Sequence, residues 1–117
     1  MHTAKTMIED AQSRIKALFQ SYRESLPPLL AELASEWDEL QKQWDADVAA
    51  EFERKVHGLA GSAATFDHEE LGQVARELEH TFRPLRETDY DPTDKRWAES
   101  NRLFKQLKEM IESVPLG

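Results

Sequence analysis

The stretch ADVAAEFERKVHGLAGSAATF, residues 46–66, decides the fold of this chain. Its apolar residues recur in steps of four and three, which is the periodicity of one face of an α-helix. These residues are Val48, Phe52, Val56, Leu59, Ala63 and Phe66. The spacing predicts a helix from about Ala46 to Thr65 that buries this face in a helical core.

Two more helices are expected ahead of this segment. A stripe of apolar residues predicts a helix from about Thr3 to Glu24. The Pro27-Pro28 pair should then break or re-aim the chain, because the residue before a proline is pushed out of the α region. A second helix should follow and run to about Trp44. The stripe of the first helix consists of Ile8, Ala11, Ile15, Leu18 and Tyr22.

The residues after Thr65 carry the signals of a helix start. Asp67 is predicted to cap the next helix, and Glu70, three residues later, to complete a capping box. Phe66 is predicted to pack on Leu71 as a hydrophobic staple.

This helix should end near Pro84. Arg83 to Thr93 then has the composition of the longest loop, and a last helix is expected from about Thr93 to Ser113.

No segment shows the alternation of a half-buried strand, so the fold class is expected to be all-α. Four amphipathic helices with short connections predict an antiparallel up-down four-helix bundle, with the additional N-terminal helix covering one end or side. At 117 residues the chain has the size of one domain, 1–117. It could also be a module of a longer regulator, with residues 114–117 as a tail or linker.

Composition argues against several classes of function. There is no cysteine, so disulfide and thiol chemistry are excluded. The net charge of −8 repels nucleic acid and anionic lipid, and no long apolar run predicts export or membrane insertion. We expect a cytoplasmic monomer that binds neither nucleic acid nor membrane.

The solvent side of the 46–65 helix is unusual. His57 projects about 150° from the centre of the apolar stripe, so it should face water. Gly58 and Gly61 are costly inside a helix, and they either mark a kink or end or leave room for a partner to approach His57. The candidate docking surface around His57 consists of Ala50, Glu53, Arg54, Ala60, Gly61 and Ala64.

The stretch KVHGLAGSAATF, followed by DHEELGQVARELE, resembles the signature of the histidine-containing phosphotransfer (HPt) family. The matching residues are His57, Leu59, Gly61, Ser62, Ala63, Phe66, Leu71, Ala75 and Leu78. The resemblance implies that His57 is a phosphoacceptor, serving a response-regulator receiver domain or a hybrid histidine kinase. It also implies a carrier rather than an enzyme, with no metal or cofactor of its own, because the Mg²⁺ belongs to the receiver.

Two positions depart from the family pattern. The family commonly has a lysine three residues after the histidine, where this chain has Ala60. We hypothesise that Arg54 supplies the missing cation toward the phosphoryl oxygens. Ala60 also leaves open a docking module without efficient phosphotransfer. The second departure is Asp67, where the family often has glycine.

One alternative comes from another class of function. Glu77 and His80 form a Glu-x-x-His spacing, which in four-helix bundles can contribute to a di-metal site. Such a site requires a second copy and two more inward carboxylates, and we find one copy only.

Overall fold

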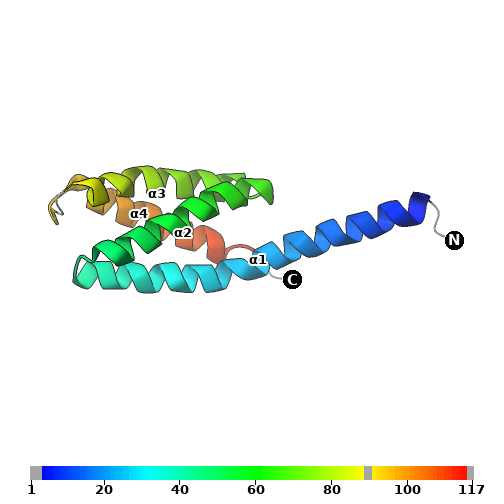
Figure 1. The fold of residues 1–117 in the computed structure, drawn as a ribbon, viewed down its shortest axis with the longest axis horizontal. Helices are drawn as coiled ribbons and strands as arrows, with labels where there is room; N and C mark the ends of the chain where they lie inside the picture. Colours follow the sequence, from blue (N-terminus) through cyan, green and yellow to red (C-terminus); the bar gives the residue numbers. More distant parts are fainter. Residues whose placement is uncertain (1–3, 89–90, 116–117) are drawn as a thin grey trace.

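The computed structural model describes residues 4–88 and 91–115, which form four helices and no strand. The helices are α1 (Ala4–Lys42), α2 (Ala46–Thr65), α3 (Glu69–Glu87) and α4 (Lys95–Glu112). Consecutive helices run in opposite directions, and α4 closes the bundle against α1 (Figure 1). The all-α prediction is confirmed, and so are the bounds predicted for α2.

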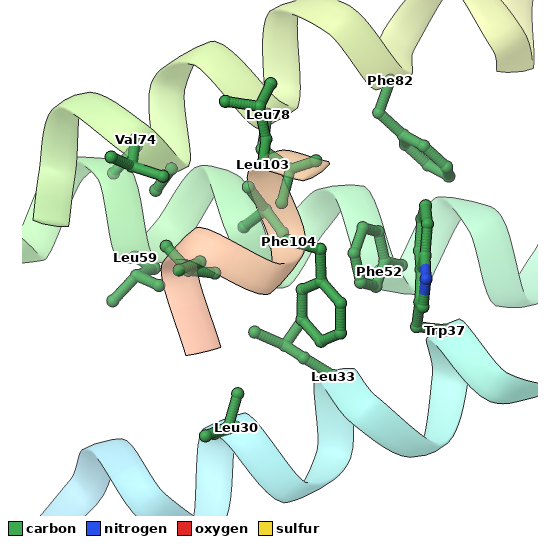
Figure 2. Close-up of a cluster of buried hydrophobic side chains, with 14 of the residues drawn as sticks. Leu30, Leu33, Trp37, Phe52, Leu59, Val74, Leu78, Phe82, Leu103 and Phe104 are labelled. Carbon is green, nitrogen blue, oxygen red and sulfur yellow. The ribbon is translucent and has the colours of Figure 1, made fainter. Parts of the chain in front are cut away.

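The core lies where the second half of α1 meets the other three helices. Trp37 of α1, Phe52 of α2 and Phe82 of α3 form its aromatic centre, with ring centroids 5.2 Å apart for Trp37 and Phe52 and 5.1 Å for Phe52 and Phe82. Figure 2 shows Phe104 of α4 beside them. Leucines from every helix fill the rest of the core. These contacts fix α2, and therefore the direction in which its outer face points.

The N-terminal region corrects one prediction. Pro27 and Pro28 lie inside the single helix α1, so the predicted break and separate first helix are wrong. Both prolines are exposed, whereas Leu26 and Leu30 on either side are buried in the core. Burial of these leucines offsets the two helical hydrogen bonds that the prolines cannot donate. The axis changes direction where α1 leaves the bundle, and residues 4–18 project away from it instead of covering it (Figure 1). The predicted start at Thr3 lies outside the described residues.

The turn from α2 to α3 corrects the capping prediction. Asp67 does not cap α3: it has a φ of 64° and ends α2 in the left-handed region. The backbone N–H of His68 donates to the Ala63 carbonyl at 2.7 Å, and that of Asp67 donates to the Ala64 carbonyl at 3.3 Å. This pair of bonds is a Schellman motif, in which glycine is the usual left-handed residue. A helix-ending requirement therefore explains the family's glycine at this position better than a helix start does.

The connection from α3 to α4 is shorter than predicted. Pro84 lies in the last turns of α3, which continues to Glu87 because Leu85 is buried and holds the chain in the helix. Asp94 caps α4 by accepting a hydrogen bond from the Arg96 backbone N–H at 2.9 Å. Residues 89 and 90 of the predicted loop lie outside the described residues.

Candidate functional site: the surface around His57

His57 lies near the middle of α2, and its side chain is 73% exposed. The prediction that this residue faces solvent is confirmed. Its ring leans toward α3, where Nδ1 lies 2.8 Å from Oε1 and 3.0 Å from Oε2 of Glu79.

The Glu79 contact assigns the protons on the imidazole. A carboxylate accepts hydrogen bonds, so Nδ1 carries the proton and donates a hydrogen bond to Glu79. Nε2 of the neutral ring then keeps its lone pair. His57 is therefore held in the tautomer whose nucleophilic nitrogen is Nε2.

A network of charged groups holds Glu79 in place. Arg83, one turn further along α3, donates to Glu79 and also, through Nε at 2.8 Å, to Glu53 of α2. Arg86 pairs with the same Glu53. Both carboxylates are buried in the seam between the helices, so their pairing with the arginines compensates for lost hydration.

A close approach of the two helices makes this network possible. A Cβ atom on Gly72 of α3 would lie 3.3 Å from the backbone carbonyl oxygen of Ala60, so the α3 backbone packs directly against α2 here. Glu79 lies two turns further along α3 than Gly72. Glycine at position 72 thus sets the helix separation that brings Glu79 to His57.

The predicted docking surface is only partly exposed. Arg54, Gly61 and Ala64 are exposed and Ala50 is half-buried. Glu53 and Ala60, however, are only 6% and 4% exposed, which corrects their expected position on an open face. The apolar stripe underestimates the buried arc of α2, because α3 also covers small and charged residues beside that stripe.

Arg54 is bound to a neighbour on its own helix. Its Nη2 lies 2.8 Å from Oε2 of Glu51, and both side chains are more than half exposed. The hydrogen bond from Arg54 lowers the pKa of the Glu51 carboxyl below its ordinary value. Arg54 is thus engaged by Glu51, and its role toward a phosphoryl group stays a prediction.

The two glycines of α2 are not required by internal packing. A Cβ atom at Gly58 or Gly61 would meet nothing within 4 Å, and α2 runs unbroken through both positions. The interpretation of these glycines as a helix end is therefore wrong. Their open surroundings are consistent with a surface that a partner approaches.

Residues from α2 and α3 line an open pocket of about 400 Å³ beside His57. Sequence reasoning missed its α3 side, which includes Glu79, Arg83 and Arg86. A signal was present, because Gly72, Ala75 and these three residues follow one another in steps of three and four, as residues on one helix face do.

The fold and site define a helical bundle that presents an exposed histidine on its surface. A model of the Hpt domain family matches residues 17–115, which is most of the chain. The chain therefore belongs to the Hpt domain family. No curated protein and no solved structure matches it.

The described residues contain no group of three or more His, Cys, Asp or Glu side chains placed to hold a metal ion. Hpt domains have no cofactor of their own. Glu77 and His80, considered above for a di-metal site, both lie on the exposed surface of α3. Within 4–88 and 91–115, no helix combines the length and apolar character needed to cross a membrane.

Proposed function

We propose that this domain is a phosphocarrier in a cytoplasmic two-component phosphorelay. Nε2 of His57 accepts a phosphoryl group from, or donates it to, the aspartate of a response-regulator receiver domain or the receiver of a hybrid histidine kinase. The observation that carries the proposal is an exposed imidazole whose Nδ1–H is bound by a buried glutamate. Membership of the Hpt family supports it independently.

The transfer requires little chemistry from this chain. Nε2 attacks the phosphorus of the aspartyl phosphate, so an N–P bond forms while the acyl O–P bond breaks and the aspartate leaves as a carboxylate. The imidazole ring becomes cationic as the N–P bond forms. Glu79, which accepts from Nδ1–H, stabilises that developing charge. Mg²⁺ and the in-line geometry come from the docked receiver, so this domain is a carrier rather than an enzyme.

The docking surface must admit a second protein close to His57. We propose that Ala50, Gly61 and Ala64 provide that access, since small side chains let the receiver bring its aspartyl phosphate within about 3 Å of Nε2. Glu53 and Ala60 contribute from below, by supporting the α2–α3 seam. Of the arginines that line the pocket, exposed Arg54 turns toward the phosphoryl oxygens, whereas Arg83 and Arg86 stay paired with the buried glutamates of the seam.

The test is incubation with phosphorylated receiver domains and, separately, with the small phosphodonor phosphoramidate. Wild-type protein should acquire label that is acid-labile and base-stable, and His57→Gln should acquire none. His80→Gln, which changes an exposed histidine of α3, is the matched control and should be labelled like wild type.

Two results would contradict the proposal. Label retained by His57→Gln would place the phosphoryl group elsewhere. The second is a folded wild-type protein that binds receivers but accepts no label from them or from phosphoramidate. That result would favour the alternative raised by Ala60, a docking module without efficient phosphotransfer.

A further inference from the structure

The N-terminal half of α1 is an apolar surface that the bundle does not cover. Residues 4–18 stand clear of the other helices (Figure 1). Met7, Ile8, Ile15 and Leu18 are between 52% and 64% exposed. A single helix of this length is marginal in water, and large apolar side chains add to the cost of leaving it alone.

Six residues of this segment follow a repeat of seven. They alternate steps of four and three, which is the spacing of the seam of a two-stranded coiled coil, and Met7 and Phe19 lie beside that seam. The seam comprises Ala4, Ile8, Ala11, Ile15, Leu18 and Tyr22. Polar residues such as Ser13 lie on the opposite side.

The seam continues into an interface that the bundle already uses. Tyr22 stacks on Phe66 with ring centroids 4.4 Å apart, and its hydroxyl lies 2.9 Å from the Ser62 hydroxyl. Beyond Tyr22 the same stripe supplies core residues, beginning with Leu26. One helix face therefore packs inside the bundle at its C-terminal end and loses its partners toward its N-terminus.

We propose that residues 4–18 pair with the same segment of a second copy as an antiparallel two-stranded coiled coil. From Tyr22 onward, each chain's own bundle occupies the seam side of α1. In a parallel pair, both bundles would compete for that one space. In an antiparallel pair, each bundle lies beyond the N-terminus of the other helix. The proposal departs from the monomer expected from the sequence.

The repeat fixes the layers of such a dimer. Ile8 would face Leu18 of the partner subunit, and Ala11 would face Ile15 of the partner subunit. The two-fold axis would cross the helices near Ser13. Small Ala11 opposite a larger residue lets the helices approach closely, as α2 and α3 do at Gly72.

The test of association is molar mass in solution, by sedimentation equilibrium over a range of concentrations. Wild type should approach twice the chain mass of 13.5 kDa. Ile15→Glu should remain at 13.5 kDa, with dimerisation weakened by at least about 100-fold because each interface would bury two unpaired carboxylates. Ser13→Glu is the matched control and should dimerise like wild type. Ile15→Glu is folded if its far-UV circular dichroism shows the helix content of the bundle and if it still unfolds cooperatively.

The test of orientation uses the absence of cysteine from the chain. Ile8→Cys and Leu18→Cys proteins should form a disulfide when mixed and oxidised, and neither should crosslink to itself. In the antiparallel arrangement the two copies of residue 8 are ten residues apart along the axis, about 15 Å, which is too far for a disulfide. The proposal would be overturned if wild type kept the monomer mass up to about 100 μM, because a stable dimer forms at much lower concentrations. Self-crosslinking of Ile8→Cys, or an assembly of more than two chains, would also overturn it.

Discussion

Two groups of arginines flank His57, and they differ in what holds them. Arg54 lies on the outer surface of α2, 66% exposed, and pairs with a glutamate one turn back on the same helix. Arg83 and Arg86 lie on α3 and pair with glutamates buried in the seam between the helices. Arg54 can exchange its partner at little cost in free energy, whereas Arg83 and Arg86 cannot.

The difference follows from solvent access. Water and salt screen an exposed ion pair, so little free energy is lost when Arg54 turns toward a phosphoryl group. Removing one member of a buried network instead leaves the other charge without a partner in a poorly hydrated site. We infer that the α3 flank orients His57 and that the α2 flank responds to the phosphoryl group.

The largest effect is expected from Glu79→Gln, which breaks the orienting flank. A hydrogen bond to a charged group contributes about 1.5–3 kcal/mol, so phosphotransfer should slow by about 10- to 100-fold. The amide keeps the shape of the side chain but loses its charge. The tautomer of His57, read from ¹⁵N chemical shifts of the ring, should shift away from the Nδ1–H form.

Glu77→Gln is the matched control, because it makes the same change on the exposed face of α3. It should leave both the transfer rate and the ¹⁵N shifts unchanged. A Glu79→Gln protein with wild-type transfer and an unchanged tautomer would show that the Glu79 contact does not orient His57.

A smaller effect is expected from Arg54→Ala, which breaks the responsive flank. Loss of one exposed cation should change the transfer rate or the lifetime of the phosphohistidine by about two- to fivefold. Arg102→Ala is the control, since Arg102 makes the same kind of exposed pair with the glutamate three residues before it on α4. If the two variants behave alike, Arg54 has no special role toward the phosphoryl group.

The sequence predicted one flank of the site and missed the other. The bounds of α2 and the exposure of His57 depend on local periodicity, so one segment was enough to predict them. The His57–Glu79 contact joins residues 22 apart and depends on the register of two helices. That register is set where Gly72 meets the Ala60 backbone. The spacing within α3 indicates which of its residues share a face, but it does not indicate which residues of α2 they meet.

The errors at helix ends have a related cause. Pro27, Pro28 and Pro84 were predicted to end helices from their local chemistry, but each lies within two residues of a leucine that the core buries. Burial of a leucine is comparable to the cost of a lost helical hydrogen bond, so tertiary packing decides the outcome. Asp67 was misassigned because only three residues, 66–68, separate α2 from α3, so the signals that end one helix and start the next fall on the same few positions.

The smallest effect is expected from Gly61→Ala, which should change stability and phosphotransfer in opposite directions. A Cβ atom at this position meets nothing within the chain, so alanine should raise the free energy of unfolding by about 0.5–1 kcal/mol. The added methyl group would stand on the surface that we propose a receiver covers, and transfer should therefore fall by a few-fold although the protein is more stable. Gly58→Ala has an equally open position and should give the same gain in thermal or urea unfolding. If both variants gain stability and neither loses transfer, the glycine at position 61 does not serve docking, and the receiver contacts His57 from the α3 side alone.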